Sequence, residues 1–380
     1  MTLHVEHTEQ MRKKLYKGHL AEIENNQKLN HREQFEQHEV LQSQPLHVSV
    51  PTGQRCNLRC LFCSDRDSST TEYEDLSFNR FLRYASVIGK ASRVQLYGWG
   101  EPLFNPDYER IFDYVIERYS GTRIHISTNG LLLSDKWTDK LLNYGKCLIN
   151  ISLNAATSKT YQIVSRCDLF HQVVDNLQRL MQAKEQQGVE DFIVSLSFVT
   201  IKPNIHELPA FIELCAELGI QNAKILDLNI HKEKHQRLAL HDVDETRNIF
   251  SRAQKIALAN NICMDTLIYR PVEYYKQDPR AYEHCNSPVD MQPVWIQENN
   301  ALFNPQPGEC YEPWETFMVM QDGSVYTCCR GREIMGNLLE QSFQEIWNGD
   351  KFRAYRRSIN SFRPPEACRT CPVKMGYAAH

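Results

Sequence analysis

The chain has 380 residues, enough for one large domain or for two to three ordinary ones. Its residues are 42% hydrophobic and 24% charged, which excludes a disordered polymer, a collagen and a small disulfide-stapled scaffold. The net charge of −4 gives no single-sign field of the kind that a dedicated nucleic-acid-binding protein carries. No apolar run approaches the roughly 20 residues that span a bilayer, and the first ten residues are too polar for a secretory signal. We therefore expect a cytoplasmic protein with no membrane and no nucleic-acid partner.

Residues 1–46 are polar and charged and are expected to form an N-terminal extension. Met11, Leu15, Leu20 and Ile23 predict one or two weakly amphipathic helices. The simplest interpretation is a solvated helix lying on the main domain. The alternative is a lid or a docking surface for a partner.

From residue 47 the sequence pattern changes to short runs rich in β-branched residues that alternate with helix-like segments. Strands are predicted at 47–51, 94–97, 123–127, 148–153, 192–200 and 224–228. Helices are predicted between them at 79–90, 108–119, 135–144, 159–186 and 206–218. Such repeats predict an α/β fold with parallel strands over residues 47–240. Six units are too few for the eight of a closed barrel, so a partial barrel and a doubly wound sheet remain open.

The remainder divides into a connection and a compact C-terminal unit. Residues 241–309 are predicted to form a helix, at 242–260, followed by an irregular, proline-rich linker from 264. Residues 310–380 are predicted to form a strand pair around 317–327, with a turn at Asp322-Gly323, and a helix at 342–357.

Thirteen cysteines, an odd number without an export signal, argue against a disulfide framework and favour metal ligation or thiol chemistry. Cys56, Cys60 and Cys63 follow the first predicted strand with the spacing Cys-x3-Cys-x2-Cys. On a [4Fe–4S] cluster, three thiolates leave one iron free to bind a small molecule. A structural zinc site would normally show four ligands in paired spacing.

Residues 55–63 closely resemble the signature of radical S-adenosylmethionine (SAM) enzymes, because the cysteine spacing, the aromatic Phe62 and the position after the first strand all agree. The resemblance implies a partial (β/α)6 barrel whose open iron chelates the amino and carboxylate groups of SAM. It further implies that an electron, from a donor such as flavodoxin or ferredoxin, cleaves SAM to a 5′-deoxyadenosyl radical.

Further segments at the ends of strands resemble the SAM-binding elements of this family. Gly98-Trp99-Gly100-Glu101 is similar to the family's Gly-Gly-Glu segment, with the first glycine replaced or moved, and this implies that Glu101 holds the SAM ammonium. The resemblance implies contacts to SAM ribose and carboxylate from Ser127, Asn129, Ser152, Asn154 and Arg166. A role in a turn or cap is the alternative for each. No catalytic acid, base or hydrogen donor is singled out.

Cys310, Cys328, Cys368 and Cys371, with the motifs around them, resemble the SPASM domain, a C-terminal extension that carries auxiliary clusters. No cysteine follows Cys371, which fits the reduced, single-cluster version called a twitch domain. The resemblance implies one auxiliary [4Fe–4S] cluster with four protein ligands, and structural zinc is the alternative that spacing alone permits. Cys329 could replace Cys328, although the turn glycine five residues earlier favours Cys328.

The resemblance implies an enzyme that abstracts a hydrogen atom from a substrate at the barrel mouth. We expect a ribosomally made precursor peptide, which would be oxidised, crosslinked or partly excised, with a separate leader-peptide-binding partner protein. The alternative is a small sugar or aminocyclitol that is dehydrogenated or epimerised in natural-product biosynthesis. A non-catalytic iron–sulfur or zinc-binding protein is a further alternative, which the Glu101 segment and the three-ligand loop oppose.

Overall fold

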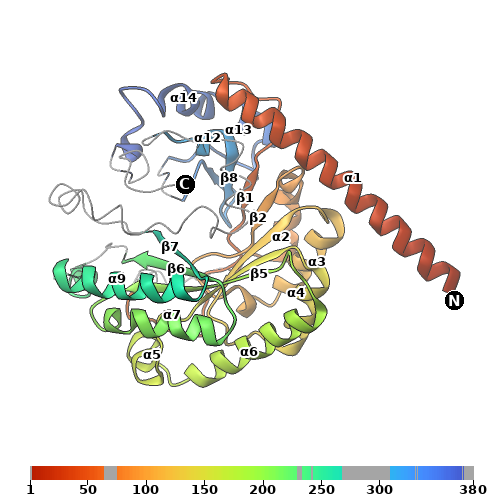
Figure 1. Cartoon of the computed structure of the whole chain (residues 1–380). Helices are drawn as coiled ribbons and strands as arrows, with labels where there is room; N and C mark the ends of the chain where they lie inside the picture. The colour runs from red at the N-terminus through yellow and green to blue at the C-terminus, as the bar shows by residue number, and fades with distance from the viewer. Residues whose placement is uncertain are drawn as a thin grey trace.

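A single ten-stranded sheet organises the part of the chain that the computed structural model describes, namely residues 2–63, 75–228, 233–240, 243–267, 309–329, 331, 333–369 and 371. The strand order is β10-β9-β8-β1-β2-β3-β4-β5-β6-β7 (Figure 1). Neighbours from β1 to β7 are parallel, β8 is parallel to β1, and β9 and β10 are antiparallel. The strands are β1 (His47–Ser49), β2 (Arg93–Gln95), β3 (Arg123–Thr128), β4 (Cys147–Ser152), β5 (Ile193–Thr200), β6 (Asn222–Asp227), β7 (Cys263–Leu267), β8 (Thr316–Val319), β9 (Ser324–Tyr326) and β10 (Gly336–Asn337).

Helices connect the parallel strands and cover one face of the sheet (Figure 1). Within the described residues, no helix is both long enough and apolar enough to cross a bilayer. The helices of the barrel are α2 (Phe78–Tyr84), α3 (Tyr108–Arg118), α4 (Asp135–Tyr144), α5 (Ser158–Ser165), α6 (Phe170–Gln187), α7 (Leu208–Glu217), α8 (Glu233–Gln236) and α9 (Val243–Ala259). The helices outside it are α1 (Thr2–Phe35), α12 (Glu312–Glu315), α13 (Phe343–Trp347) and α14 (Asp350–Ser358). Single 3₁₀ turns lie at Ala85–Ile88, Pro102–Phe104, Ile205–Glu207 and Glu366–Cys368.

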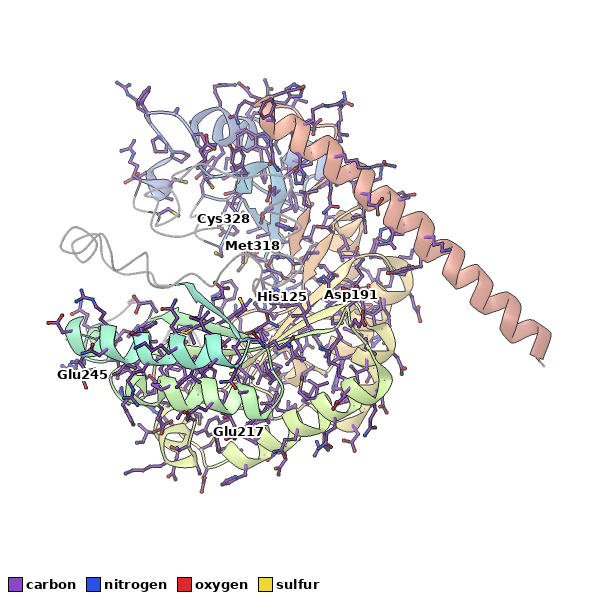
Figure 2. The ribbon with its side chains drawn as sticks, in the orientation of Figure 1. His125, Asp191, Glu217, Glu245, Met318 and Cys328 are labelled. Atoms are coloured by element: carbon purple, nitrogen blue, oxygen red, sulfur yellow. The ribbon has the colours of Figure 1, made fainter. Side chains whose placement is uncertain are left out.

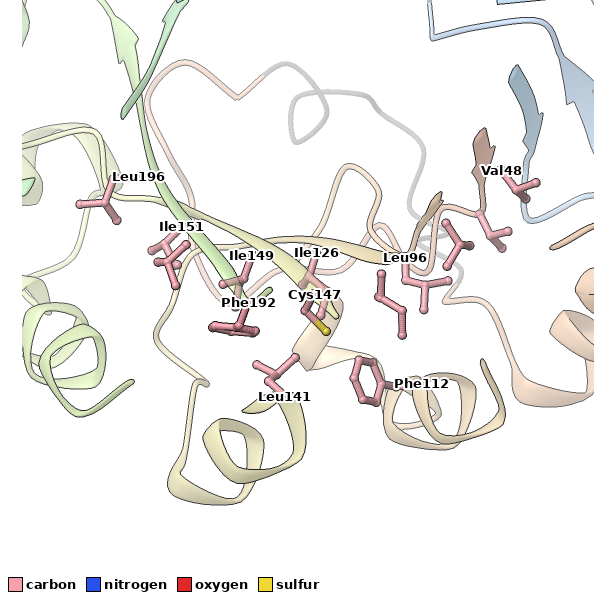
Figure 3. Packing of buried hydrophobic residues seen from close by; sticks show 14 of the residues in the cluster. Val48, Leu96, Phe112, Ile126, Leu141, Cys147, Ile149, Ile151, Phe192 and Leu196 are labelled. Atoms are coloured by element: carbon pink, nitrogen blue, oxygen red, sulfur yellow. The ribbon is translucent and has the colours of Figure 1, made fainter. Parts of the chain in front are cut away.

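The helix-facing side of the sheet is the hydrophobic core. Every second residue of a strand points to this side, and these residues are almost wholly buried. Figure 3 shows Ile126, Ile149 and Ile151 of the strands packing toward Phe112 of α3 and Leu141 of α4. Burial of this face stabilises the α/β fold that the sequence predicted, which is confirmed.

The opposite face of the same strands is polar. Asn150 of β4 lies at its centre: its Nδ2 donates to Ser127 Oγ (3.2 Å) and Ser197 Oγ (3.1 Å), and its Oδ1 accepts from Ser195 Oγ (3.0 Å). Other polar residues in the same alternation are Gln95, His125, Ser152, Lys224 and Asp265, and they alternate with a few apolar ones such as Leu148 and Val199. The interior of a closed eight-stranded barrel is instead filled by branched apolar side chains. This polar side, called the inner face below, is therefore suited to holding a ligand.

Three sequence expectations about elements are wrong. The single helix expected over 342–357 is two helices, α13 and α14, because Asn348 and Gly349 interrupt it. Residues 263–267 form β7, although the chain from 264 onward was expected to be irregular, because they find a parallel partner in β6. The single helix expected over 159–186 is two helices, since Arg166 takes a left-handed conformation (φ 61°) that ends α5. The rest of the predicted linker, from 268 to 308, lies outside the described residues.

Helix α1 is attached to both halves of the molecule by buried polar side chains. His19 Nε2 donates to Gly89 O (2.8 Å), because its Nδ1 accepts from Gly121 N (3.0 Å). Asn30 Nδ2 donates to Ser43 Oγ (2.9 Å) and to the carbonyl oxygen of Trp314 in the C-terminal unit (2.7 Å). The helix lies on the main domain as expected, but its inward side is buried rather than solvated.

Candidate functional site

The loop that carries the first three cysteines follows β1 and packs on the segment after β2. Gly100 N donates to Gly53 O (3.2 Å), and Glu101 N donates to Arg55 O (2.8 Å). A Cβ on Gly98 would lie 2.9 Å from Gly53 O, and one on Gly100 would overlap the carbonyl group of Arg55. The close packing of the cysteine loop therefore requires glycine at both positions. The resemblance had instead assigned this segment to SAM binding.

Cys56, Cys60 and Cys63 are brought close together by this loop. Burial, and then the charges of Cys56, Cys63 and Cys167, raise the pKa of Cys60 to about 12. Leu58 N donates to Cys56 Sγ (3.4 Å). Three neighbouring thiols on one loop fit an iron–sulfur cluster, because bound iron keeps such thiols deprotonated.

Glu101 is the buried carboxylate at the centre of the site, with 2% of its surface exposed. Its Oε1 accepts from Thr128 Oγ1 (2.7 Å) and Leu103 N (3.1 Å), and its Oε2 accepts from Asn129 N (2.7 Å). Burial raises the pKa of Glu101 to about 7, while these three hydrogen bonds act to lower it. The carboxylate ties the segment after β2 to the end of β3.

Asn129 joins this carboxylate to the cysteine loop. Its Nδ2 donates to Asn57 Oδ1 (2.7 Å) and lies 3.8 Å from Cys56 Sγ. The structure therefore brings together the predicted residues Cys56, Glu101 and Asn129. Asn57 and Thr128 were not singled out from the sequence, although both lie inside the recognised segments.

The other predicted SAM contacts lie in different parts of the structure, some on the inner face and some exposed. Ser127 and Ser152 lie on the inner face, where Ser197 Oγ donates to Ser152 Oγ (3.3 Å). Asn154 is left-handed (φ 60°), and its Oδ1 accepts from Val199 N (2.8 Å), so this oxygen is committed to β5. Arg166 is exposed at the end of α5, and Trp99 is 43% exposed.

Helix α5 brings a fourth thiol toward the loop. Leu61 N donates to Val164 O (2.7 Å), and Cys167 follows two residues after α5 ends. The charge of Cys167 raises the pKa values of both Cys60 and Tyr161. Cys167 was not singled out from the sequence, because only the tertiary packing of α5 brings it here.

A second group of thiols lies in the C-terminal unit. Burial raises the pKa of Cys310, and Glu312, Cys328 and Cys368 raise it further, so these three thiols are close to one another. The side chain of Asn360 bonds both backbone groups of Cys310: its Oδ1 accepts from Cys310 N (2.9 Å), and its Nδ2 donates to Cys310 O (3.1 Å). Cys371 N donates to Cys368 O (3.2 Å), which places the fourth predicted ligand beside the third.

Cys329 lies near the barrel. It is exposed, and its charge contributes to the raised pKa, about 12, of Tyr97 in the barrel. Cys328 instead acts on Cys310 and on Tyr355 in the C-terminal unit. This arrangement favours Cys328 over Cys329 as a ligand. Across the described residues, no three His, Cys, Asp or Glu side chains are arranged around a point where a single metal ion would bind.

Two family models match the chain. One, described as the radical SAM superfamily, matches residues 50–215. The other, SPASM, described as an iron–sulfur cluster-binding domain, matches residues 310–372. Together the two matches span more than half of the chain.

Curated relatives match to different extents. The AdoMet-dependent heme synthase of Methanosarcina barkeri is 23% identical over 307 residues, 79% of this chain and 82% of the relative. A probable GTP 3′,8-cyclase of Saccharolobus islandicus is 30% identical over 209 residues, 54% of this chain and 64% of the relative. The matched region of the second relative is therefore less than two thirds of that protein.

Solved structures share the fold. SuiB of Streptococcus suis bound to S-adenosylmethionine has a TM-score of 0.63 at 15% identity, covering 90% of this chain and 74% of that chain. SuiB bound to the precursor peptide SuiA gives the same TM-score, covering 91% and 73%. The structure of anSMEcpe with bound AdoMet has a TM-score of 0.56 at 16% identity, covering 88% and 85%.

Proposed function

Because the chain belongs to the radical SAM superfamily and carries a SPASM domain, we propose that it is an enzyme that modifies a peptide by radical chemistry. The first domain implies a [4Fe–4S] cluster with SAM, and the second implies auxiliary iron–sulfur chemistry. When bound, the SAM-binding cluster supplies a 5′-deoxyadenosyl radical that abstracts a hydrogen atom from substrate. The protein binds, orients and shields the reactants.

The observation that carries this proposal is the convergence of the three loop thiols with Asn129 and Glu101. Cys56, Cys60 and Cys63 would hold the cluster. Glu101 would accept a hydrogen bond from the SAM ammonium, and Asn129 would orient SAM beside Cys56. Ser127, Ser152 and Arg166 are assigned to the SAM ribose and carboxylate, while Asn154 acts by shaping the end of β4.

The C-terminal thiols are assigned to one auxiliary [4Fe–4S] cluster. Cys310, Cys328, Cys368 and Cys371 would be its ligands. The match to a family model described as an iron–sulfur cluster-binding domain supports a cluster over zinc. Four protein ligands would leave this cluster with no iron open to substrate.

Similarity of fold to SuiB, which has been solved with a precursor peptide, supports a peptide substrate. A leader-peptide-binding partner and a flavodoxin- or ferredoxin-type electron donor belong to the same proposal. The second candidate is a small-molecule substrate such as a sugar or aminocyclitol. The heme synthase relative favours a small-molecule substrate in general, because it matches over 79% of this chain.

The direct test is reductive SAM cleavage by anaerobically reconstituted protein, with 5′-deoxyadenosine measured by mass spectrometry. Replacing Cys56, Cys60 and Cys63 with Ala should remove about four irons per chain and abolish cleavage. The control variant is Cys329→Ala, an exposed thiol outside the assigned ligands. A triple variant that still cleaves SAM would refute the proposal. Mass change of a short peptide encoded beside this gene separates a peptide from a small molecule.

A further inference from the structure

We propose that His125 is a specificity-determining residue on the inner face, and that it hydrogen-bonds an uncharged substrate group that both donates and accepts. A hydroxyl and a carboxamide are side-chain groups of this kind. The inference rests on the proposed function, because it names the substrate chemistry of the same site. Nothing in the SAM-binding segments requires this histidine.

His125 belongs to a row of side chains that crosses four neighbouring strands. It pairs in register with Gln95 of β2, Gln95 pairs with Ser49 of β1, and Ser49 pairs with Met318 of β8. These side chains therefore form one row on the inner face, and Figure 2 marks Met318 and His125 in this row. The row runs from the barrel into the first strand of the SPASM domain.

Strand β3 sets the distance between His125 and the SAM side of the site. Asn129, which lies beside Cys56 Sγ, follows His125 by four residues along the end of β3. At strand spacing this separates their Cα atoms by about 13 Å. Ser127 lies between them on the same face. A substrate held at His125 can therefore extend along the inner face toward the cluster loop.

The two ring nitrogens of His125 are buried. The side chain is 6% exposed, yet neither Nδ1 nor Nε2 has a hydrogen-bond partner among the residues that the structure describes. Its ring makes an edge contact with Tyr97, at 4.9 Å between centroids, and this fixes the ring plane. A buried polar atom without a partner costs about 1–3 kcal/mol, so two on one side chain indicate a bound group.

The imidazole ring of His125 is uncharged. Burial, and then the charges of Lys224 and Arg93, hold the pKa of His125 well below its ordinary value, so the imidazole is neutral. A neutral imidazole offers one donor and one acceptor on opposite sides of the ring. A carboxylate could satisfy only the donor.

The neighbouring cations already have countercharges. Lys224 pairs in register with Asp265, and the negative charge of Asp265 acts to raise the pKa of Lys224. Glu312 and Glu315 act in the same way on Arg93. The charges of Lys224 and Arg93 are therefore each opposed by acidic residues of the same region. These observations favour an uncharged group over an acidic one.

The test compares capped tripeptides, acetyl-Ala-X-Ala-amide with X as Ser, Asn, Asp or Ala, binding to iron-loaded, SAM-bound protein in calorimetry. The Ser and Asn peptides should bind at least about tenfold tighter than the Ala peptide, as expected for hydrogen bonds to a buried partner. The Asp peptide should bind no tighter than the Ala peptide. His125→Phe keeps the ring contact with Tyr97 and should abolish the discrimination.

Two further variants keep the test decisive. His125→Gln retains one donor and one acceptor and should retain part of the discrimination, whereas a merely structural role would not distinguish it from His125→Phe. His171→Phe, on the exposed side of α6, should behave as the wild type. Equal binding of all four peptides, binding of none, tightest binding of the Asp peptide, or discrimination that survives His125→Phe would each overturn the inference. SAM cleavage without peptide reports separately on the proposed function and should be unchanged in His125→Phe.

Discussion

The buried carboxylate of Glu101 predicts that SAM binding depends on pH. Glu101 has a pKa of about 7 because burial disfavours its charge. The native protein therefore holds this proton below pH 7 and releases it above. Only the ionised form can make a charge-assisted hydrogen bond to the SAM ammonium.

We predict that SAM affinity rises by about tenfold between pH 5.5 and 7, because Glu101 ionises over this range. In Glu101→Gln the affinity should fall by roughly 10- to 150-fold at pH 7, the value of a charged hydrogen bond, and should no longer vary with pH. Equilibrium dialysis of reconstituted protein measures both. Glu109→Gln, a change at an exposed ion pair, is the control. Unchanged affinity in Glu101→Gln would leave this carboxylate with only its role in joining β2 to β3.

The adjacent thiols Cys328 and Cys329 are predicted to differ in iron binding. Cys328→Ala should reduce iron from about eight to about four per chain, because this thiol lies near Cys310 and Cys368. Cys329→Ala should keep about eight, because that thiol is exposed and acts on Tyr97 of the barrel rather than on Cys310. Iron and zinc are counted on the same samples. Loss of iron in Cys329→Ala alone would reverse the assignment, and about four irons with one zinc in the wild type would make the C-terminal site structural.

At the scale of elements, the segment after β2 and the cysteine loop are fitted backbone to backbone. We predict that Gly100→Ala prevents the loop from closing, because its Cβ would overlap the carbonyl group of Arg55. The variant should lose most of the iron of the first cluster while the auxiliary iron remains. Gly18→Ala on α1, where nothing lies within 4 Å of the added carbon, is the matched control. Full iron content in Gly100→Ala would show that the loop can relax.

Helix α1 is predicted to contribute stability through its buried amides. Asn30→Ala should lower the free energy of unfolding by about 2–3 kcal/mol, because it leaves Trp314 O without this donor and removes the bond to Ser43. Asn25→Ala, on the exposed side of the same helix, should change it by no more than about 0.5 kcal/mol. Denaturant titration measures both variants, and equal effects would contradict a bridging role for the helix.

At the scale of the whole molecule, the barrel and the SPASM domain share one sheet. Phe317 of β8 is fully buried against Phe343, Trp347 and Phe352, and its strand pairs with β1. We predict that Phe317→Ala costs about 3–5 kcal/mol and also lowers the iron content of the first cluster, because β1 leads into the cysteine loop. Calorimetry and iron analysis test this. A variant that loses only auxiliary iron would show that the two domains respond independently.

Local signals in the sequence were sufficient for part of this molecule. The cysteine spacing and the six β-branched runs predicted the family and the main strands, because both are short-range patterns. The strand β7 was missed because its partner β6 is about 40 residues earlier, and only that pairing makes Cys263–Leu267 a strand. The break at Arg166 was missed because no glycine or proline marks it. In the sequence the inner face appears only as polar residues that alternate with apolar ones. Which of the two sets faces the helices is decided by the fold.

The pairing of β8 with β1 has a consequence for biosynthesis. The first cysteine loop leaves the ribosome early, but the strand that flanks β1 on its outer side is made more than 250 residues later. Contacts of such long sequence separation form late in folding. The sheet around the first cysteine loop is therefore complete only when nearly the whole chain has been made.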